Sequence, residues 1–138
     1  MHYNVISDSG KRVPRKKILN LMAKIEEEEE PPSSTVNIVF VDDNRIVRLN
    51  KEYRGKTGPT DVLSFNLDDD EGVDSIFGEI YISTDTASKN ADSSNLTFSD
   101  EILRLCCHGF LHLLGYDHEK ENERIIMEQR ENHYLEML

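Results

Sequence analysis

Apolar residues recur with two periods along the chain, and each period predicts one kind of element. Runs in which apolar and polar residues alternate, rich in β-branched and aromatic side chains, predict strands. Apolar residues three or four apart predict the buried faces of helices, as in Ile18, Leu21, Met22 and Ile25. We expect strands at residues 3–7, 36–41, 61–65 and 77–83. With about five helices between and after them, the pattern predicts a single α+β domain, residues 1–138, around a four-stranded sheet.

Prolines and polar residues mark the ends of the first two helices. The first helix begins near Pro14 and ends at Pro31-Pro32. Its last residues, Glu26–Glu30, are expected to fray into solvent rather than to bind a partner. A residue within 42–44 caps the second helix, which precedes a loop of glycines and proline from Arg54 to Thr60. One side of this helix is formed by Ile46, Leu49, Asn50 and Tyr53.

The second half of the chain contains three further helices. Ser83 or Thr84 caps a short helix that runs to about Asp92. Thr97 caps the next helix, 98–114, which is apolar on nearly every side and belongs in the core. The last helix, 119–136, is expected to bury Ile125, Ile126, Met127 and Tyr134. The acidic stretch Asp68–Gly72 lacks the ordered spacing of a calcium loop, which favours a solvated hairpin connection.

The composition suits a cytoplasmic globular protein. No apolar run approaches the ~20 residues of a membrane span, and the N-terminus does not resemble a signal peptide. The adjacent Cys106 and Cys107 predict reduced, buried thiols, with Cys107 as an extra metal ligand the less favoured alternative. The net charge of −11 is unevenly divided: residues 1–60 carry +2 and residues 61–138 carry −13. A solvated surface is the ordinary explanation of the basic clusters in the first half.

Three histidines in the fourth helix and the segment after it predict a metal site. His108 and His112 stand four residues apart, so they share one helix face. Gly115 can end the helix in a left-handed conformation, and His118 follows three residues later as a third ligand. Three imidazoles without a fourth protein ligand leave one position of a tetrahedral zinc open for water or substrate. This pattern favours a catalytic metal over a structural one.

The spacing matches the zinc-peptidase motif H-E-x-x-H-x-x-G-x-x-H except at one position. The glutamate that serves those enzymes as general base is replaced by Gly109. Because glycine cannot accept a proton, the metal site persists without the base that peptide hydrolysis needs. Peptide cleavage by the usual route is therefore disfavoured.

Three segments resemble the YbeY family of metal-dependent endoribonucleases, which mature ribosomal RNA in bacteria. Residues 108–118 match its H-G-x-L-H-L-x-G-Y-D-H signature at every fixed position. Residues 49–54 and 59–65 are similar to its second block, and Phe77-Gly78-Glu79-Ile80 to a third that more often has aspartate at the position of Glu79. The resemblance implies a mixed sheet with a zincin-like metal helix, one Zn²⁺ per chain held by His108, His112 and His118, and an essential arginine at Arg54.

The resemblance also implies the reaction and its partners. The expected substrate is single-stranded RNA, chiefly the end of the small-subunit ribosomal RNA, and the expected setting is rRNA maturation and ribosome quality control. A ribosomal or GTPase protein would recruit the enzyme. Our hypothesis is that zinc-activated water attacks a phosphodiester while Arg54 clamps the phosphate, with His112 and Arg54 as the catalytic residues. The ordinary alternative for Arg54 is an ion pair with Glu52 or Asp61.

Two other functions, and the role of Asp117, are left open by the residues alone. The chain could be a small zinc peptidase or amidase with a different base, or a non-catalytic ribosome assembly factor whose zinc is structural. Asp117 either orients a histidine ring or forms the turn in Gly-Tyr-Asp. Tyr116 is expected to pack, and His2 and His133 lie outside the metal spacing and are expected at the surface.

Overall fold

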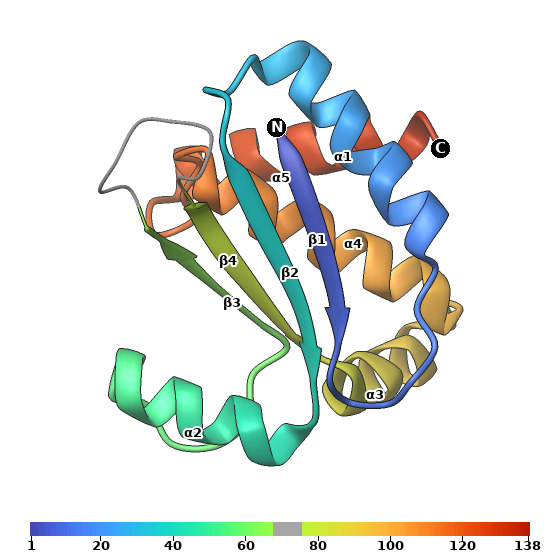
Figure 1. Cartoon of the computed structure of the whole chain (residues 1–138), viewed down its shortest axis with the longest axis vertical. Coiled ribbons are helices and arrows are strands. Elements are labelled where there is room, and N and C mark those ends of the chain that lie inside the picture. The colour runs from blue at the N-terminus through green and yellow to red at the C-terminus, as the bar shows by residue number, and fades with distance from the viewer. Residues whose placement is uncertain (68–75) are drawn as a thin grey trace.

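The computed structural model describes residues 1–67 and 76–138 and contains one mixed sheet with helices on both faces (Figure 1). The strands are β1 (His2–Ser7), β2 (Thr35–Val41), β3 (Val62–Asn66) and β4 (Ile76–Ser83). The helices among the described residues are α1 (Arg15–Glu29), α2 (Asp43–Arg54), α3 (Thr84–Ser94), α4 (Phe98–Leu113) and α5 (Glu121–Glu136). The predicted α+β class, the four strands and the five helices are confirmed, whereas the domain boundaries 1–138 stay a prediction.

The sheet order is β1-β2-β4-β3, in which β1, β2 and β4 are parallel and β3 is antiparallel to β4. Helices connect the parallel strands, as such crossovers require. The antiparallel β3 forms one edge of the sheet. The acidic stretch 68–72, predicted to be a hairpin connection, lies outside the described residues.

Alternate residues of the strands face two separate cores. The larger core packs Ile38, Phe40 and Ile80 against α1, α4 and α5. In Figure 1, α4 and α5 lie behind the sheet and α1 lies at the upper right, beside β1. The smaller core packs Val39 and Val41 against α2 on the other face. The two-residue period of a strand sends neighbouring side chains to opposite faces, so the mostly apolar β2 is buried on both. No helix in the described parts of the chain is long and apolar enough to cross a membrane.

The glutamates at the end of α1 do not fray, which corrects the sequence prediction. The helix continues to Glu29, and Glu30 follows in a left-handed conformation with φ +49°. Glu26 accepts hydrogen bonds from the N-terminal amine at 2.8 Å and from the Tyr3 hydroxyl at 2.7 Å. Glu28 pairs with His133, and Glu29 reaches α5 and the segment after α4. The acidic run therefore fastens α1 to its neighbours.

Two predicted apolar faces are only partly buried. Met127 and Tyr134 of α5 lie in the core as predicted, but Ile125 and Ile126 are 45% and 50% exposed. On α2, Ile46, Leu49 and Asn50 are buried and Tyr53 is 60% exposed. In each helix the buried stripe is narrower than its apolar content suggests.

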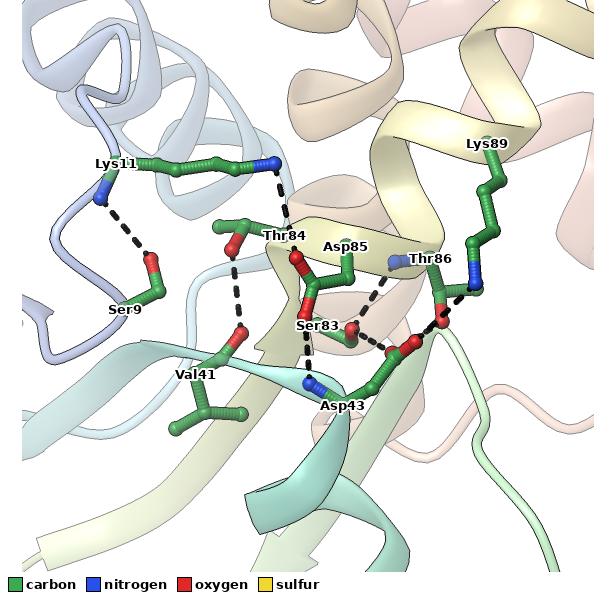
Figure 2. Close-up of polar contacts among 9 residues, drawn as sticks. All are labelled: Ser9, Lys11, Val41, Asp43, Ser83, Thr84, Asp85, Thr86 and Lys89. Carbon is green, nitrogen blue, oxygen red and sulfur yellow. Dashed lines mark hydrogen bonds and ion pairs between the residues drawn. The ribbon is translucent and has the colours of Figure 1, made fainter.

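The N-termini of α2 and α3 are joined by hydrogen bonds where β2 and β4 end (Figure 2). Asp43 Oδ1 accepts hydrogen bonds from Ser83 Oγ at 2.5 Å and Thr86 Oγ1 at 2.7 Å, and Lys89 lies 3.5 Å from Oδ2. In return, Asp85 Oδ2 accepts the backbone N–H of Asp43 at 2.9 Å. Carboxylates at helix N-termini satisfy free N–H groups and the helix dipole. This network fixes the start of α2, and thereby the position of Arg54 at its end.

Candidate metal centre

The structure brings His108, His112 and His118 together at the end of α4. Their ligand nitrogens all lie within 4.8 Å of one another, so the group could hold a metal ion. The ring centroid of His112 lies 4.8 Å from that of His108 and 4.7 Å from that of His118. His118 is exposed and the other two rings are half-buried, which leaves the cluster open to solvent. Among the described residues, this cluster contains only imidazole ligands.

A Schellman turn returns His118 to the helix. The N–H of Gly115 donates to His112 O at 3.1 Å, and that of Tyr116 to Leu111 O at 3.0 Å. Gly115 has φ +105°, a conformation that residues with a Cβ rarely adopt. The predicted role of Gly115 is confirmed: it ends the helix so that the chain reverses toward His108 and His112.

Gly109 places helix α4 directly against the sheet. A Cβ at this position would lie 2.7 Å from Ile80 Cγ2 and 3.2 Å from Ser64 Oγ. Ser64 Oγ also donates a hydrogen bond to Gly109 O at 2.9 Å. The position that carries the general base of zinc peptidases therefore faces packed strands and has no room for a glutamate.

Glu131 of α5 orients the first histidine, and sequence reasoning did not identify it. Its Oε1 lies 2.5 Å from His108 Nδ1, and its side chain is 12% exposed. A carboxylate on Nδ1 leaves Nε2 as the free ligand atom and fixes the direction of the ring. Glu131 is one of many acidic residues in an amphipathic helix, so no local pattern marks it.

The protonation of His112 favours metal binding. Burial, aided by the neighbouring His108 and His118, lowers the pKa of His112 to about 4. The ring is therefore neutral at physiological pH, which is the form that coordinates a metal. The two cysteines take no part in the cluster: both are free and fully buried, and burial raises the pKa of Cys107 to about 12. The alternative that Cys107 is a ligand gains no support.

Arg54 lies across the edge strand beside the histidines. Its Nη2 donates a hydrogen bond to Ser64 O at 2.8 Å, and its guanidinium carbon lies 5.5 Å from the centre of the Phe65 ring. The alternative prediction of an ion pair with Glu52 or Asp61 is not observed. Asp61 Oδ2 instead accepts a hydrogen bond from Asn90 Nδ2 and lies 3.9 Å from Arg104 Nη2. Within residues 1–67 and 76–138, no carboxylate lies within ion-pair distance of Arg54.

The two residues before His118 hold the turn in place. The Asp117 carboxylate accepts the backbone N–H of His118 at 2.7 Å, so its observed contact is that of a turn-forming residue. The Tyr116 hydroxyl donates to Glu29 Oε1 at 2.8 Å. Glu29 Oε2 also accepts from Arg130 and from the buried Tyr134, which ties α1, α5 and the turn together.

A cleft of about 790 Å³ joins the histidines to the arginine. One wall comes from the end of α4 and the turn after it, and the other from β3 and the loop after α2. Its lining includes Arg54, Lys56, Ser64, His108, His112 and His118. His2 and His133 are exposed, as predicted, and lie outside this cleft.

Comparisons with known proteins agree on one family. Residues 5–138 match the family model described as Endoribonuclease YbeY. The chain is 42% identical over 130 residues to Endoribonuclease YbeY of Desulforamulus reducens, covering 88% of this chain and 85% of that protein. It is 40% identical over 129 residues to that of Lysinibacillus sphaericus, covering 87% and 81%.

A solved structure shares the fold of this chain. A Thermotoga maritima protein determined in solution is similar over 97% of this chain and 87% of that one, with a TM-score of 0.64 and 34% identity. The residues that match the family model, 5–138, include strands β2, β3 and β4, helix α4 and the turn that carries His118. The chain belongs to the endoribonuclease YbeY family.

Proposed function

We propose that the protein is a zinc-dependent, single-strand-specific endoribonuclease that matures small-subunit ribosomal RNA and acts in ribosome quality control. The observation that carries this proposal is that one cleft is lined by three neighbouring imidazoles and by an arginine with no ion-pair partner among residues 1–67 and 76–138. Relatives named as endoribonucleases supply the type of reaction. The proposed metal ligands are His108, His112 and His118, and the proposed catalytic residues are Arg54 and His112.

The residues present fit one Zn²⁺ ion. Three imidazoles, one of them oriented by a carboxylate and another kept neutral by burial, form the donor set of an open catalytic site. When bound, zinc would supply a Lewis acid and lower the pKa of a water molecule toward ~7. His112 would contribute as a ligand, because its nitrogen stays unprotonated in the working pH range.

Arg54 would hold the phosphate that is cleaved. Its guanidinium carries several N–H groups in a plane, and the bond to Ser64 O uses only one terminal nitrogen. The remaining donors can bind two phosphate oxygens and offset the charge that builds up during cleavage. Contacts with Ser64 and Phe65 limit the rotation of the side chain, so it is held in position before the substrate arrives.

The site is poorly suited to the peptidase alternative. Gly109 offers no general base, and the packing of Ile80 against it excludes a larger side chain. An extended peptide substrate would also pair with the free edge of β3, where Arg54 already occupies the carbonyl of Ser64. Phosphodiester cleavage needs neither the base nor the strand edge.

Metal analysis combined with RNA digestion tests the proposal. Wild-type protein and His112→Ala would be compared on one RNA sequence in single-stranded and duplex form. We expect the wild type to contain one zinc per chain and to cut the single strand, and the variant to lose both properties while keeping its circular dichroism spectrum. Unfolding of His112→Ala, or of the wild type after chelation, would instead support a structural zinc in a ribosome assembly factor. Cleavage of a peptide panel without cleavage of RNA would support the peptidase.

A protein partner would assist RNA binding. The acidic second half of the chain opposes an RNA backbone, so the isolated enzyme should bind weakly and with strong salt dependence. We propose that a ribosomal or GTPase protein in the cytoplasm brings the enzyme to the small subunit. Co-sedimentation with small subunits, which His112→Ala should retain, tests this recruitment separately from catalysis.

A further inference from the structure

Three aromatic rings form a row on the sheet face that α2 partly covers. The centroid of Tyr53 lies 5.2 Å from that of Phe65, and Phe65 lies 5.9 Å from Tyr81, each pair in an edge-to-face arrangement. Tyr53 comes from the last turn of α2, Phe65 from β3 and Tyr81 from β4. Three elements therefore converge on one aromatic row.

Tyr53 stands at the open end of this row. Its side chain is 60% exposed, the largest value among the exposed large hydrophobic residues in the described part of the chain. Phe65 and Tyr81 are half-buried against the smaller core. The row thus presents one aromatic ring to solvent on a support of two packed rings.

The surroundings of Tyr53 carry positive charge. Between residues 45 and 56 the chain has one acidic side chain, Glu52, and five basic ones: Arg45, Arg48, Lys51, Arg54 and Lys56. All five basic residues are exposed. In a protein of net charge −11, this is a local reversal beside the cleft. Aromatic rings interleaved with cations favour a nucleic acid strand over an apolar partner.

Arg54 connects the row to the metal centre. It follows Tyr53 in the sequence, lies over Phe65, and lines the cleft together with the three histidines. Resting on the function proposed above, we propose that Tyr53, supported by Phe65, stacks on one unpaired base of the RNA next to the phosphate held by Arg54. A base within a duplex cannot present its face to this ring, so the same contact would select single strands.

Substitution of Tyr53 combined with a modified substrate tests the proposal. Tyr53→Ala should raise the KM for a short single-stranded RNA about tenfold, as loss of one stacked base predicts, and leave kcat nearly unchanged. Tyr53→Phe, which keeps the ring, should behave as the wild type. An RNA with an abasic site beside the mapped cut should raise the KM of the wild type and leave that of Tyr53→Ala unaltered. Ile126→Ala, at an exposed position of α5, is the matched control.

The outcomes separate this inference from the proposed function. Equal KM values for Tyr53→Ala and wild type on intact RNA would overturn the stacking site. So would a rise in KM on substitution of Tyr53 that is as large on abasic RNA as on intact RNA. If the wild type cuts no RNA, the proposed function fails. The stacking site is then tested by RNA binding in the presence of a chelator, using 2-aminopurine fluorescence at the same nucleotide. A signal that Tyr53→Ala abolishes and Tyr53→Phe retains supports the site; identical signals overturn it.

Discussion

Glu131 Oε1 lies 2.5 Å from His108 Nδ1, joining helix α5 to the candidate metal centre across 23 residues of chain. The contact fixes which nitrogen of His108 faces the cluster, because the hydrogen-bonded nitrogen is not free to coordinate. Arg130, the preceding residue, pairs with Glu29 at 2.7 Å and holds α5 in the register that the contact needs. The orientation of His108 thus depends on packing between α1 and α5.

Glu131→Gln should weaken metal binding without unfolding the protein. Glutamine keeps the size of the side chain but loses the negative charge that makes the His108 ring a stronger ligand. We expect affinity for zinc to fall about 10–100-fold, the usual cost of losing such a partner. A titration against a chromogenic chelator measures it. Glu128→Gln, in an exposed position of the same helix, is the control, and equal affinities for the two variants would contradict the proposed role.

Gly109→Ala should destabilise the protein, although glycine to alanine in a helix usually stabilises by about 0.5–1 kcal/mol. The added Cβ would meet Ile80 Cγ2 at 2.7 Å, so helix α4 or strand β4 must move. Such overpacking costs roughly 1–3 kcal/mol. Urea unfolding measures the change, with Gln129→Ala on the surface of α5 as the control. A stability equal to the wild type would show that α4 is not held this close to the sheet.

The histidine cluster was predictable because its geometry is local. His108 and His112 follow helical spacing, Gly115 allows the turn, and His118 is near in sequence. The strands were predictable for the same reason, since alternation is visible within a few residues. Arg54 was identified only through the family resemblance: nothing near it in sequence indicates that it reaches a histidine cleft more than 50 residues away.

Contacts between distant segments account for what was missed. The run Glu26–Glu30 suggests a solvated end, yet the partners of Glu29 are Tyr116, Arg130 and Tyr134, all about a hundred residues later. In the sequence Glu131 cannot be distinguished from its acidic neighbours, because its contact with His108 forms only when α5 packs against α4. A sequence pattern gives the polarity of a helix face, but not which side chain it meets.

Glu29→Ala should lower stability more than Glu27→Ala on the same helix. Burial would raise the pKa of Glu29, but hydrogen bonds from Tyr134, Arg130 and Tyr116 outweigh it and lower the pKa, so the residue is a charged acceptor. Removing it takes the acceptor away from the Tyr116 and Tyr134 hydroxyls and one of several partners away from Arg130. The loss should cost about 2 kcal/mol. Thermal melting measures the loss, and Glu27, which is exposed, is the matched control. Equal melting temperatures would mean that the network does not stabilise the fold.

The metal-free protein should lose stability as the pH falls below 6.5, partly because of His112. Its pKa is lowered from 6.5 to about 4, so in this window the unfolded chain binds a proton there and the folded protein does not. Stability then decreases as the pH falls, and the effect is complete below the folded-state pKa. Urea unfolding measures the free energy of unfolding between pH 6.5 and about 5, above the pH at which most carboxylates titrate, and so isolates the contribution of histidine. His112→Gln should flatten the slope and His2→Gln should not; identical slopes for His112→Gln and wild type would contradict the assignment.

Arg54→Ala should abolish RNA cleavage while zinc content stays at the wild-type level. The guanidinium is not a proposed ligand, and its hydrogen bond goes to Ser64 O, so its loss should leave the histidines in place. Removing a group that stabilises developing charge typically lowers kcat about 10²–10³-fold. Arg54→Lys should recover little, since an ammonium group cannot bind two phosphate oxygens in one plane. Arg48→Ala, exposed on the same helix and outside the cleft lining, controls for loss of charge. A wild-type cutting rate in Arg54→Ala would refute the phosphate clamp, and loss of zinc would show that Arg54 supports the metal centre instead.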